Sequence, residues 1–377
     1  MAKKTINKEL TGAQDLYNFL FEACNIIRGP VSQDNFKDYI TPLLYYKRIS
    51  DVYDEETEEA LISSGGDKEY ASLPEQHRFV IPDGCHWQEV RERTENLGAA
   101  IVGAMRQIEI ANPDTLYGVL SMFSSQKWTN KAILNDSKIR DLIEHLSKRK
   151  LGNKDYPADL MGDAYEILLK KFADDSKAQA GEFYTPRSVV RLLVHILDPQ
   201  PGETVYDPAC GSGGMLIEAI RYMHDDSLCC GSIFGQEKNV VNAAIAKMNL
   251  FLHGASDFNV MQGDTLRDPK ILQGGNIAKF DCVIANPPFS LENWGATEWS
   301  SDKYKRNIYG TPSDSCGDYA WIQHMICSMS SGKGRMAVVM PQGILFRGNQ
   351  EAEIRKQLVE SDLIEAVVTL GDKLFYG

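Results

Sequence analysis

Residues 281–289 read DCVIANPPF, an apolar run that leads directly into Asn286-Pro287-Pro288-Phe289. The run has the length and composition of a buried β-strand. Proline fixes its own φ and has no N–H, and it pushes the residue before it into extended backbone. The residues after the strand are therefore expected to hold a side-chain amide, carbonyl oxygens and an aromatic ring in a fixed arrangement.

This arrangement suits a reaction in which an amino group conjugated to a ring must act as the nucleophile. If the Asn286 side-chain oxygen and the Pro287 carbonyl each accept a hydrogen bond from that nitrogen, its delocalised lone pair is freed and aimed. Phe289 would stack on the ring, an interaction that contributes roughly 1–3 kcal/mol per base. The alternative is an ordinary turn at the end of a strand, because Asn-Pro is a common loop signal.

Length and composition indicate a globular protein of about two domains. The chain has 377 residues, 43% of them hydrophobic and 24% charged, and domains usually span roughly 100–200 residues. The first residues, MAKKTINKEL, contain no apolar signal-peptide core, and no run approaches the roughly 18 apolar residues of a membrane span. We therefore expect a cytoplasmic protein without a membrane partner.

The formal net charge of −12 argues against a free-standing nucleic-acid binder with a basic surface. A DNA-acting protein of this composition needs a local basic groove or a partner subunit that supplies the phosphate contacts. The eight cysteines are scattered, without C-x-x-C and without histidines at metal spacing. Reduced thiols and no metal site are therefore expected.

Residues 1–175 are predicted to form a helical N-terminal domain that contacts partners or DNA. Apolar residues recur at helical spacing in residues 15–27, 40–49, 87–110, 116–122, 139–146 and 158–172. Residues 63–84 are rich in glycine and proline and are expected to form a loop. No catalytic set of residues is evident in this half.

Residues 176–377 are predicted to form an α/β domain, because short apolar runs alternate with helical patterns. The expected strands are residues 204–210, 232–236, 258–262, the run that opens this section, 335–341 and 363–370. The expected helices are residues 187–197, 215–223, 240–252, 318–329 and 350–359. Thr185 is the expected N-cap of the first helix, with Pro186 at its first position.

Several candidate ligand-binding residues follow predicted strands. Glycines 211, 213 and 214 follow the first strand, where they allow backbone to approach a ligand closely. Glu237 ends the second strand and Asp264 follows the third, at the sheet edge where open parallel sheets bind ligands. Asp264 is alternatively an N-cap. A nicotinamide dinucleotide site is a further alternative, although G-x-G-x-x-G is absent and Asp207-Pro208 interrupts the expected strand.

The long segment 290–315 interleaves basic and aromatic residues beside this edge. A surface of this kind suits backbone phosphates and unstacked bases, and a mobile lid is the competing interpretation. The residues concerned are Trp294, Trp299, Lys303, Tyr304, Lys305 and Arg306.

Taken together, DPACGSGG at residues 207–214, GEFYTP at 181–186 before it and NPPF at 286–289 after it resemble the amino-methylating DNA methyltransferases that use S-adenosylmethionine. The order of these motifs is similar to the modification (methylation) subunit of type I restriction–modification systems, and the helical half is similar to that subunit's N-terminal domain. The resemblance implies a Rossmann-like methyltransferase sheet behind a helical domain, and site-specific methylation of the exocyclic amino group of a flipped adenine.

The resemblance also implies a role for each site residue. Cofactor binding would fall to Glu182, Phe183, Tyr184, Thr185, Pro186, Arg187, Asp207, Gly211, Ser212, Gly213, Gly214, Glu237 and Asp264, with Glu237 on the ribose hydroxyls and Asp264 on the adenine amino group. The catalytic residues would be Asn286, Pro287, Pro288 and Phe289, which hold the flipped base. Phenylalanine in the last position is usual for adenine rather than cytosine.

The implied partners are double-stranded DNA and a specificity subunit, with two modification subunits per complex and the restriction subunit as a further candidate. This sheet type normally has a seventh, antiparallel strand, whereas the chain stops just after the sixth, so a truncated C-terminal end is expected. Two alternatives stay open. One is a non-catalytic assembly module left by truncation, and the other is an amino or amide methyltransferase that acts on RNA or protein.

Overall fold

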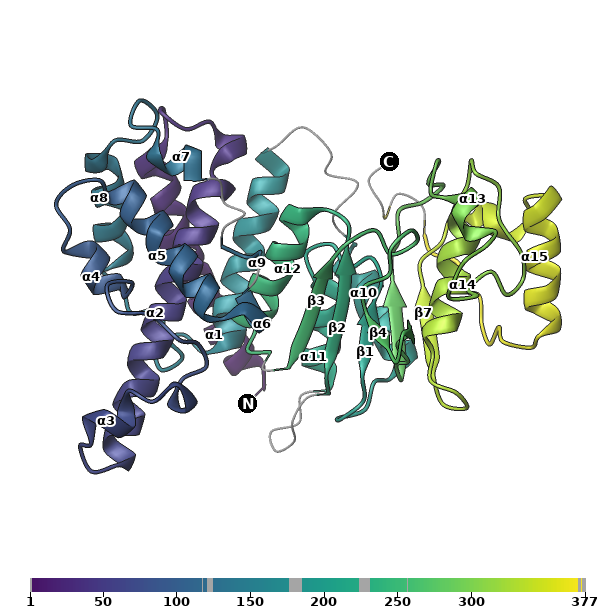
Figure 1. The fold of residues 1–377 in the computed structure, drawn as a ribbon, viewed down its shortest axis with the longest axis horizontal. Helices are drawn as coiled ribbons and strands as arrows, with labels where there is room; N and C mark the ends of the chain where they lie inside the picture. The colour runs from purple at the N-terminus through teal and green to yellow at the C-terminus, as the bar shows by residue number, and fades with distance from the viewer. Residues whose placement is uncertain are drawn as a thin grey trace. The chain divides into compact units, whose positions relative to one another are not determined.

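The computed structural model describes residues 2–116, 118–120, 125–175, 185–223, 231–255, 257–371 and 374. The chain divides into two compact units (Figure 1). The helical unit comprises Met1–Ala178 with Phe251–Gly254, and the sheet unit comprises Gln179–Leu250 with Ala255–Gly377.

The helical unit is built from α-helices and short 3-10 helices. They are α1 (Ala2–Ile27), η1 (Gln33–Asn35), α2 (Lys37–Ser63), α3 (Lys68–Ala71), η2 (Pro74–Gln76), α4 (Trp87–Arg91), α5 (Leu97–Ala111), α6 (Pro113–Leu116), α7 (Ser125–Thr129), α8 (Asp136–Leu146) and α9 (Ala158–Asp175). The first helix packs against α8 and α9 through its apolar stripe. Arg48 of α2 is 2% exposed and donates to the carbonyls of Leu151 and Tyr156, which fixes the loop before α9.

The helical unit corrects three expectations. Residues 87–110 form two helices rather than one, because Asn96 adopts a left-handed φ of 55°. The Asp136 carboxylate accepts hydrogen bonds there from the N–H groups of Asn96 and Leu97, at 3.1 and 3.0 Å. A residue of another helix, α8, therefore caps the start of α5. Residues 63–84 contain α3, which Asp67 caps, and η2. Residues 118–120 form a turn, so the helix predicted at 116–122 is wrong there.

The sheet unit alternates strands and helices. Its elements are α10 (Arg187–Leu197), β1 (Val205–Asp207), α11 (Gly214–Met223), β2 (Ile233–Glu237), α12 (Val240–Leu252), β3 (Phe258–Gln262), β4 (Leu272–Gln273), β5 (Asn276–Ile277), β6 (Cys282–Ala285), α13 (Ala296–Trp299), α14 (Asp318–Ser328), β7 (Arg335–Val338), η3 (Gln342–Leu345) and α15 (Asn349–Glu360). The main sheet has the order β3-β2-β1-β6-β7 and its pairings are parallel. The α/β class predicted from the sequence is confirmed.

Both faces of the sheet are covered, because successive strand residues point to opposite sides. Val205 and Ile284 face a core shared with α10, α11 and α12. Tyr206 and Val283 face the other core, which includes Met325 of α14. In Figure 1, β3, β2 and β1 lie side by side and β7 stands at the opposite side of the sheet.

The strand order places a topological switch point beside β1. The chain adds β2 and β3 on one side of β1, and it then crosses to add β6 and β7 on the other side. Ligands of open parallel sheets bind outside the carboxyl ends of the strands at such a point.

The sixth strand predicted at residues 363–370 is wrong. These residues form no strand, and Val367 is 63% exposed although Leu370 packs against the core. A strand is stable only when its backbone groups pair, and within the described residues β7 pairs with β6 alone. An apolar run with strand-like composition is therefore insufficient here.

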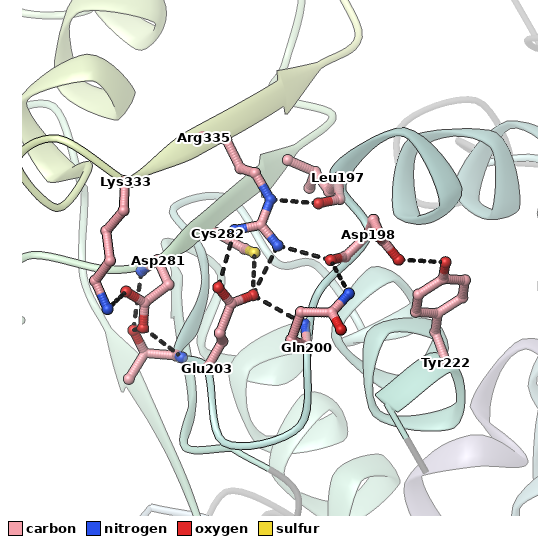
Figure 2. A network of polar contacts seen from close by, with 10 residues as sticks. Leu197, Asp198, Gln200, Glu203, Tyr222, Asp281, Cys282, Lys333 and Arg335 are labelled. Carbon is pink, nitrogen blue, oxygen red and sulfur yellow. Dashed lines mark hydrogen bonds and ion pairs between the residues drawn. The ribbon is translucent and has the colours of Figure 1, made fainter. Parts of the chain in front are cut away.

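A polar network fixes the amino ends of three strands, opposite the edge described below (Figure 2). Arg335 begins β7 and binds both carboxylate oxygens of Glu203, at 3.0 and 2.7 Å. The same guanidinium donates to the carbonyls of Leu197 and Asp198, at the end of α10.

The second part of this network joins β1 to β6. Thr204 donates its N–H and its hydroxyl to one oxygen of Asp281, at 3.0 and 2.9 Å. Lys333 pairs with the other oxygen at 2.6 Å. The relative positions of β1, β6 and β7 are therefore held at the amino edge, which leaves the carboxyl edge open for a site.

Candidate active site

The carboxyl ends of β1, β2, β3 and β6 bring together most of the predicted site residues of the sheet unit. Gly211–Gly214 follow β1, Glu237 is the last residue of β2, and Asn286 follows β6 directly. Asp264 lies two residues beyond β3. Thr185, Pro186 and Arg187 lie at the start of α10, whereas Glu182, Phe183 and Tyr184 lie outside the described residues.

The glycine loop after β1 is a tight turn that only glycine fits easily. Gly211 and Gly213 have φ values of 53° and 84°, in the left-handed region. The Gly213 N–H closes the turn on the Cys210 carbonyl at 2.7 Å. A Cβ at Gly213 would lie 3.5 Å from Ala246 of α12, so the turn also sits close against that helix.

Glu237 braces this loop from the end of the neighbouring strand. Its Oε2 accepts the Gly211 N–H at 3.0 Å, and its Oε1 accepts the Asn239 N–H at 2.7 Å. Burial raises the pKa of Glu237, against the opposing effect of these N–H donors. Each carboxylate oxygen has a second lone pair, so the fixed carboxylate can also accept a pair of neighbouring hydroxyls.

Asp207 is buried at the end of β1, with 2% exposure. Its Oδ1 accepts the Ala209 N–H at 2.9 Å. Burial is the main reason that the pKa of Asp207 rises to about 8; the Ala209 N–H opposes this effect and the Glu237 charge adds to it. A cationic group beside this carboxyl would favour its ionised form.

Asp264 has the geometry of a turn cap. Its Oδ1 accepts the N–H groups of Leu266 and Arg267, both at 3.2 Å. Its Oδ2 pairs with Lys238 at 2.9 Å, which links the ends of β2 and β3. The carboxylate thus has a fixed position at the sheet edge, and a role in ligand binding stays a prediction.

Asn286 presents a buried acceptor with an unusual environment. Its Nδ2 donates to the Thr185 hydroxyl at 2.9 Å. Its Oδ1 is buried and has no hydrogen-bond partner among the described residues. Leaving a buried acceptor unpaired costs about 1–3 kcal/mol, so this oxygen is well suited to accept a hydrogen bond from a ligand.

The same contact corrects the role expected for Thr185. Helix α10 begins at Arg187 with Pro186 in the N-cap position, so Thr185 is not the cap. Its hydroxyl instead orients the Asn286 amide, 101 residues along the chain. The sequence placed both residues in a site but gave no sign of this contact.

The backbone after Phe289 is held in place by Asp318 and Arg347. Phe289 is 39% exposed, and Ser290 has a left-handed φ of 50°. The Ser290 N–H donates at 2.7 Å to Asp318, which is fully buried at the start of α14. Arg347 pairs with Asp318 and also donates to the Ser290 hydroxyl at 3.1 Å. Asp318 and Arg347 were not predicted, because no local pattern marks such long-range anchors.

The chain's similarity to known proteins agrees with this geometry. Residues 156–377 match the family described as N-6 DNA Methylase. The chain belongs to the N-6 DNA methylase family. Residues 16–146 also match the HsdM N-terminal domain.

Individual relatives come from archaea and bacteria. The MjaVII type I restriction enzyme methylase subunit of Methanocaldococcus jannaschii is 35% identical, in an alignment that covers 89% of this chain and 58% of that protein. The EcoKI methylase subunit of Escherichia coli is 27% identical, over 96% of this chain and 65% of that protein. The chain thus spans about three fifths of the length of these relatives.

A solved structure also shares the fold. The type I restriction-modification system methyltransferase subunit from Streptococcus thermophilus superposes with a TM-score of 0.76 at 26% identity. The match covers 92% of this chain and 79% of that one.

The segment 290–315 differs in part from the prediction, because Lys303 and Lys305 are exposed but three of the other residues are buried. Trp294, Trp299 and Arg306 are 2%, 1% and 1% exposed, so they cannot face a nucleic acid. Arg306 pairs with Asp302 and donates to the carbonyls of Thr265 and Leu266, at 2.9 and 2.8 Å. A buried guanidinium needs such partners, and here it fixes the turn that begins at Asp264.

The described residues show neither a metal site nor a membrane-spanning helix. They contain no group of three or more His, Cys, Asp or Glu side chains arranged to hold a metal ion. Among the same residues, no helix combines the length and the apolar character that crossing a membrane requires.

Proposed function

We propose that this chain is the methylation subunit of a type I restriction–modification complex and methylates the exocyclic amino group of adenine in DNA. The observation that carries the proposal is the buried Oδ1 of Asn286, directly after β6, which has no hydrogen-bond partner within the part of the chain that the structure describes. It lies at the same sheet edge as the glycine loop of β1, so a base amino group and a methyl donor can meet there.

The residues of this edge fit S-adenosylmethionine, whose sulfonium supplies the methyl group. Glu237 would accept the ribose hydroxyls, since its carboxylate is already fixed by Gly211 and Asn239. The Gly211–Gly214 turn, including Ser212, would lie against the methionine part, with Asp207 nearby. Asp264 would accept the adenine amino group. Thr185, Pro186 and Arg187 would complete the site with Glu182, Phe183 and Tyr184.

The target amino group would be held by the segment after β6. Asn286 Oδ1 and the Pro287 carbonyl would each accept a hydrogen bond from this nitrogen, which would free its lone pair for in-line attack on the methyl carbon. Pro288 keeps the backbone extended, and Phe289 stacks on the base. S-adenosylmethionine would supply the methyl group from its sulfonium, and the methylated nitrogen would then release one proton to water. Positioning and electrostatics do most of this catalytic work.

The target adenine must leave the duplex to reach this edge, and we propose that other subunits help. The net charge of −12 leaves much of the phosphate contact to a specificity subunit. Relatives are named as methylase subunits of type I restriction enzymes, which supports a place in such a complex. We propose two methylation subunits and one specificity subunit per complex, with a restriction subunit as a further partner. Residues 1–175 would make partner or DNA contacts, and residues 176–377 would carry out catalysis.

A substrate panel tests the proposal. The chain, assembled with its specificity subunit, is incubated with methyl-labelled S-adenosylmethionine and either duplex DNA, RNA or protein. We expect label in DNA alone, and at least about 100-fold slower labelling with the Asn286→Ala variant. Label in RNA or protein would favour the amide or RNA-base alternative. Cofactor binding without transfer to any substrate would favour a non-catalytic assembly module.

A further inference from the structure

Two large apolar side chains are exposed beside the target-base segment. Leu345 is 50% and Phe346 is 73% exposed, at the end of η3. They lie among polar positions, because Gln342 and residues 348–350 are also exposed. The surface of these two side chains is much smaller than the roughly 1,200 Å² that a stable protein interface buries.

The backbone around this pair is held rigidly. The Tyr319 hydroxyl donates to the Ile344 carbonyl at 2.7 Å, and Arg355 donates to the same oxygen at 3.0 Å. Arg355 also donates to the Arg347 carbonyl at 2.9 Å. Both residues that flank the pair are therefore fixed, while the two side chains between them face solvent.

The pair is tied directly to the proposed base pocket. Arg347, which follows Phe346, donates to the hydroxyl of Ser290, which follows Phe289. Both Arg347 and Ser290 also bind the buried carboxylate of Asp318. Phe346 and Phe289 are thus each one residue away from the same anchored contact.

We propose that Phe346, with Leu345 beside it, inserts into the DNA base stack next to the target adenine and takes the place that the flipped base leaves. The inference rests on the function proposed above. Apolar side chains that insert between base pairs offset part of the cost of unstacking. A rigid, exposed pair continuous with the base pocket fits this role better than a wide protein interface does.

The test compares Phe346→Ala and Phe346→Trp in the full chain assembled with its specificity subunit. One duplex carries the target adenine opposite thymine, and the other carries it opposite an abasic site, where extrusion already costs less. We expect Phe346→Ala to lower kcat/KM by about 10- to 100-fold on the paired duplex and by less than about threefold on the abasic one. Phe346→Trp keeps a ring and should stay near the parent value.

A second readout does not require methyl transfer. With 2-aminopurine in place of the target adenine, the fluorescence increase on binding should be lost in Phe346→Ala and kept in Phe346→Trp. Val359→Ala is the matched control, because Val359 is 58% exposed near the end of α15, and it should change neither readout.

The outcomes separate the two proposals. Equal losses on the paired and abasic duplexes, or loss of the specificity subunit from the Phe346→Ala complex, would overturn insertion and place Phe346 in another contact. If the parent complex methylates neither duplex but shows fluorescence that depends on Phe346, the proposed chemistry fails while insertion stands. An unchanged fluorescence increase in Phe346→Ala would overturn insertion whatever the methylation result.

Discussion

The hydrogen bond between Thr185 and Asn286 predicts a specific loss of catalysis when Thr185 becomes valine. The hydroxyl holds the Asn286 amide with its Nδ2 inward at 2.9 Å and its Oδ1 available to the substrate. Valine removes this partner but keeps the shape of the side chain. The amide can then rotate and present a donor, which cannot accept a hydrogen from the target amino group.

The size of the effect follows from the free energy that this hydrogen bond contributes. A neutral hydrogen bond contributes about 0.5–1.5 kcal/mol net, and about 1.4 kcal/mol corresponds to a tenfold change in rate. Thr185→Val should therefore lower the rate of methyl transfer by roughly 2- to 13-fold. Asn286→Ala removes the acceptor itself. It should lower the rate of methyl transfer by about 100- to 1,000-fold, which is the usual effect of losing an oriented catalytic hydrogen-bonding group.

Single-turnover methyl transfer at saturating cofactor measures these rates, and calorimetry gives the cofactor Kd of each variant. Asn286→Ala should leave the Kd nearly unchanged, and Thr185→Ser should transfer at close to the parent rate. In the Asn286→Ala background, Thr185→Val should have no further effect on the rate. Two fully additive losses, or a Thr185→Val enzyme as fast as the parent, would refute the orienting role.

Two further predictions concern carboxylates at opposite edges of the sheet. Burial raises the pKa of Asp207 to about 8, and a bound cation favours its ionised form. The affinity for S-adenosylmethionine should therefore increase by up to about tenfold for each unit that the pH rises towards that pKa. Calorimetry should find that affinity depends less on pH in Asp207→Asn, and an identical pH dependence in both proteins would contradict this linkage. Arg335→Met should destabilise the sheet unit by about 1.5–3 kcal/mol, since Glu203 and two carbonyls lose a charged partner. Lys333→Met changes a side chain that is 69% exposed, so it should destabilise the unit by less than about 1 kcal/mol. Hydrogen exchange of β1 and β6 measures both effects. The Arg335 hydrogen bond also lowers the pKa of Glu203. The stabilisation of the sheet unit by this ion pair should therefore be complete above the ordinary pKa of about 4.5 and be lost as the pH falls through the lowered pKa. The stability of Arg335→Met should lack this pH dependence.

The sequence predicted the regular elements of the sheet unit well. The observed bounds of α10, α12 and β3 are those predicted, because apolar periodicity and the flanking residues mark them clearly. Strand ends also placed Glu237 and Asn286 at one edge, as the parallel arrangement requires. The order β3-β2-β1-β6-β7 was not predicted, because apolar periodicity does not show which strands pair.

The rest depended on contacts between distant residues. Arg306 occurs in a run that reads as a basic, aromatic surface, yet its pairing with Asp302 and two carbonyls buries it. Residues 363–370 have the composition of a strand, but a strand also needs a neighbour. The Thr185–Asn286 contact joins residues whose local sequence predicts a helix start and a strand end.

The most direct test of the account is the chemical identity of its product. Duplex DNA is incubated with the chain, its specificity subunit and S-adenosylmethionine that carries a trideuterated methyl group, and the nucleosides are then separated and weighed by mass spectrometry. The account predicts trideuterated N6-methyladenine with the parent chain and at least about 100-fold less of it with Asn286→Ala. The label on cytosine or on a ring nitrogen, or equal adenine labelling by the Asn286→Ala complex, would contradict it.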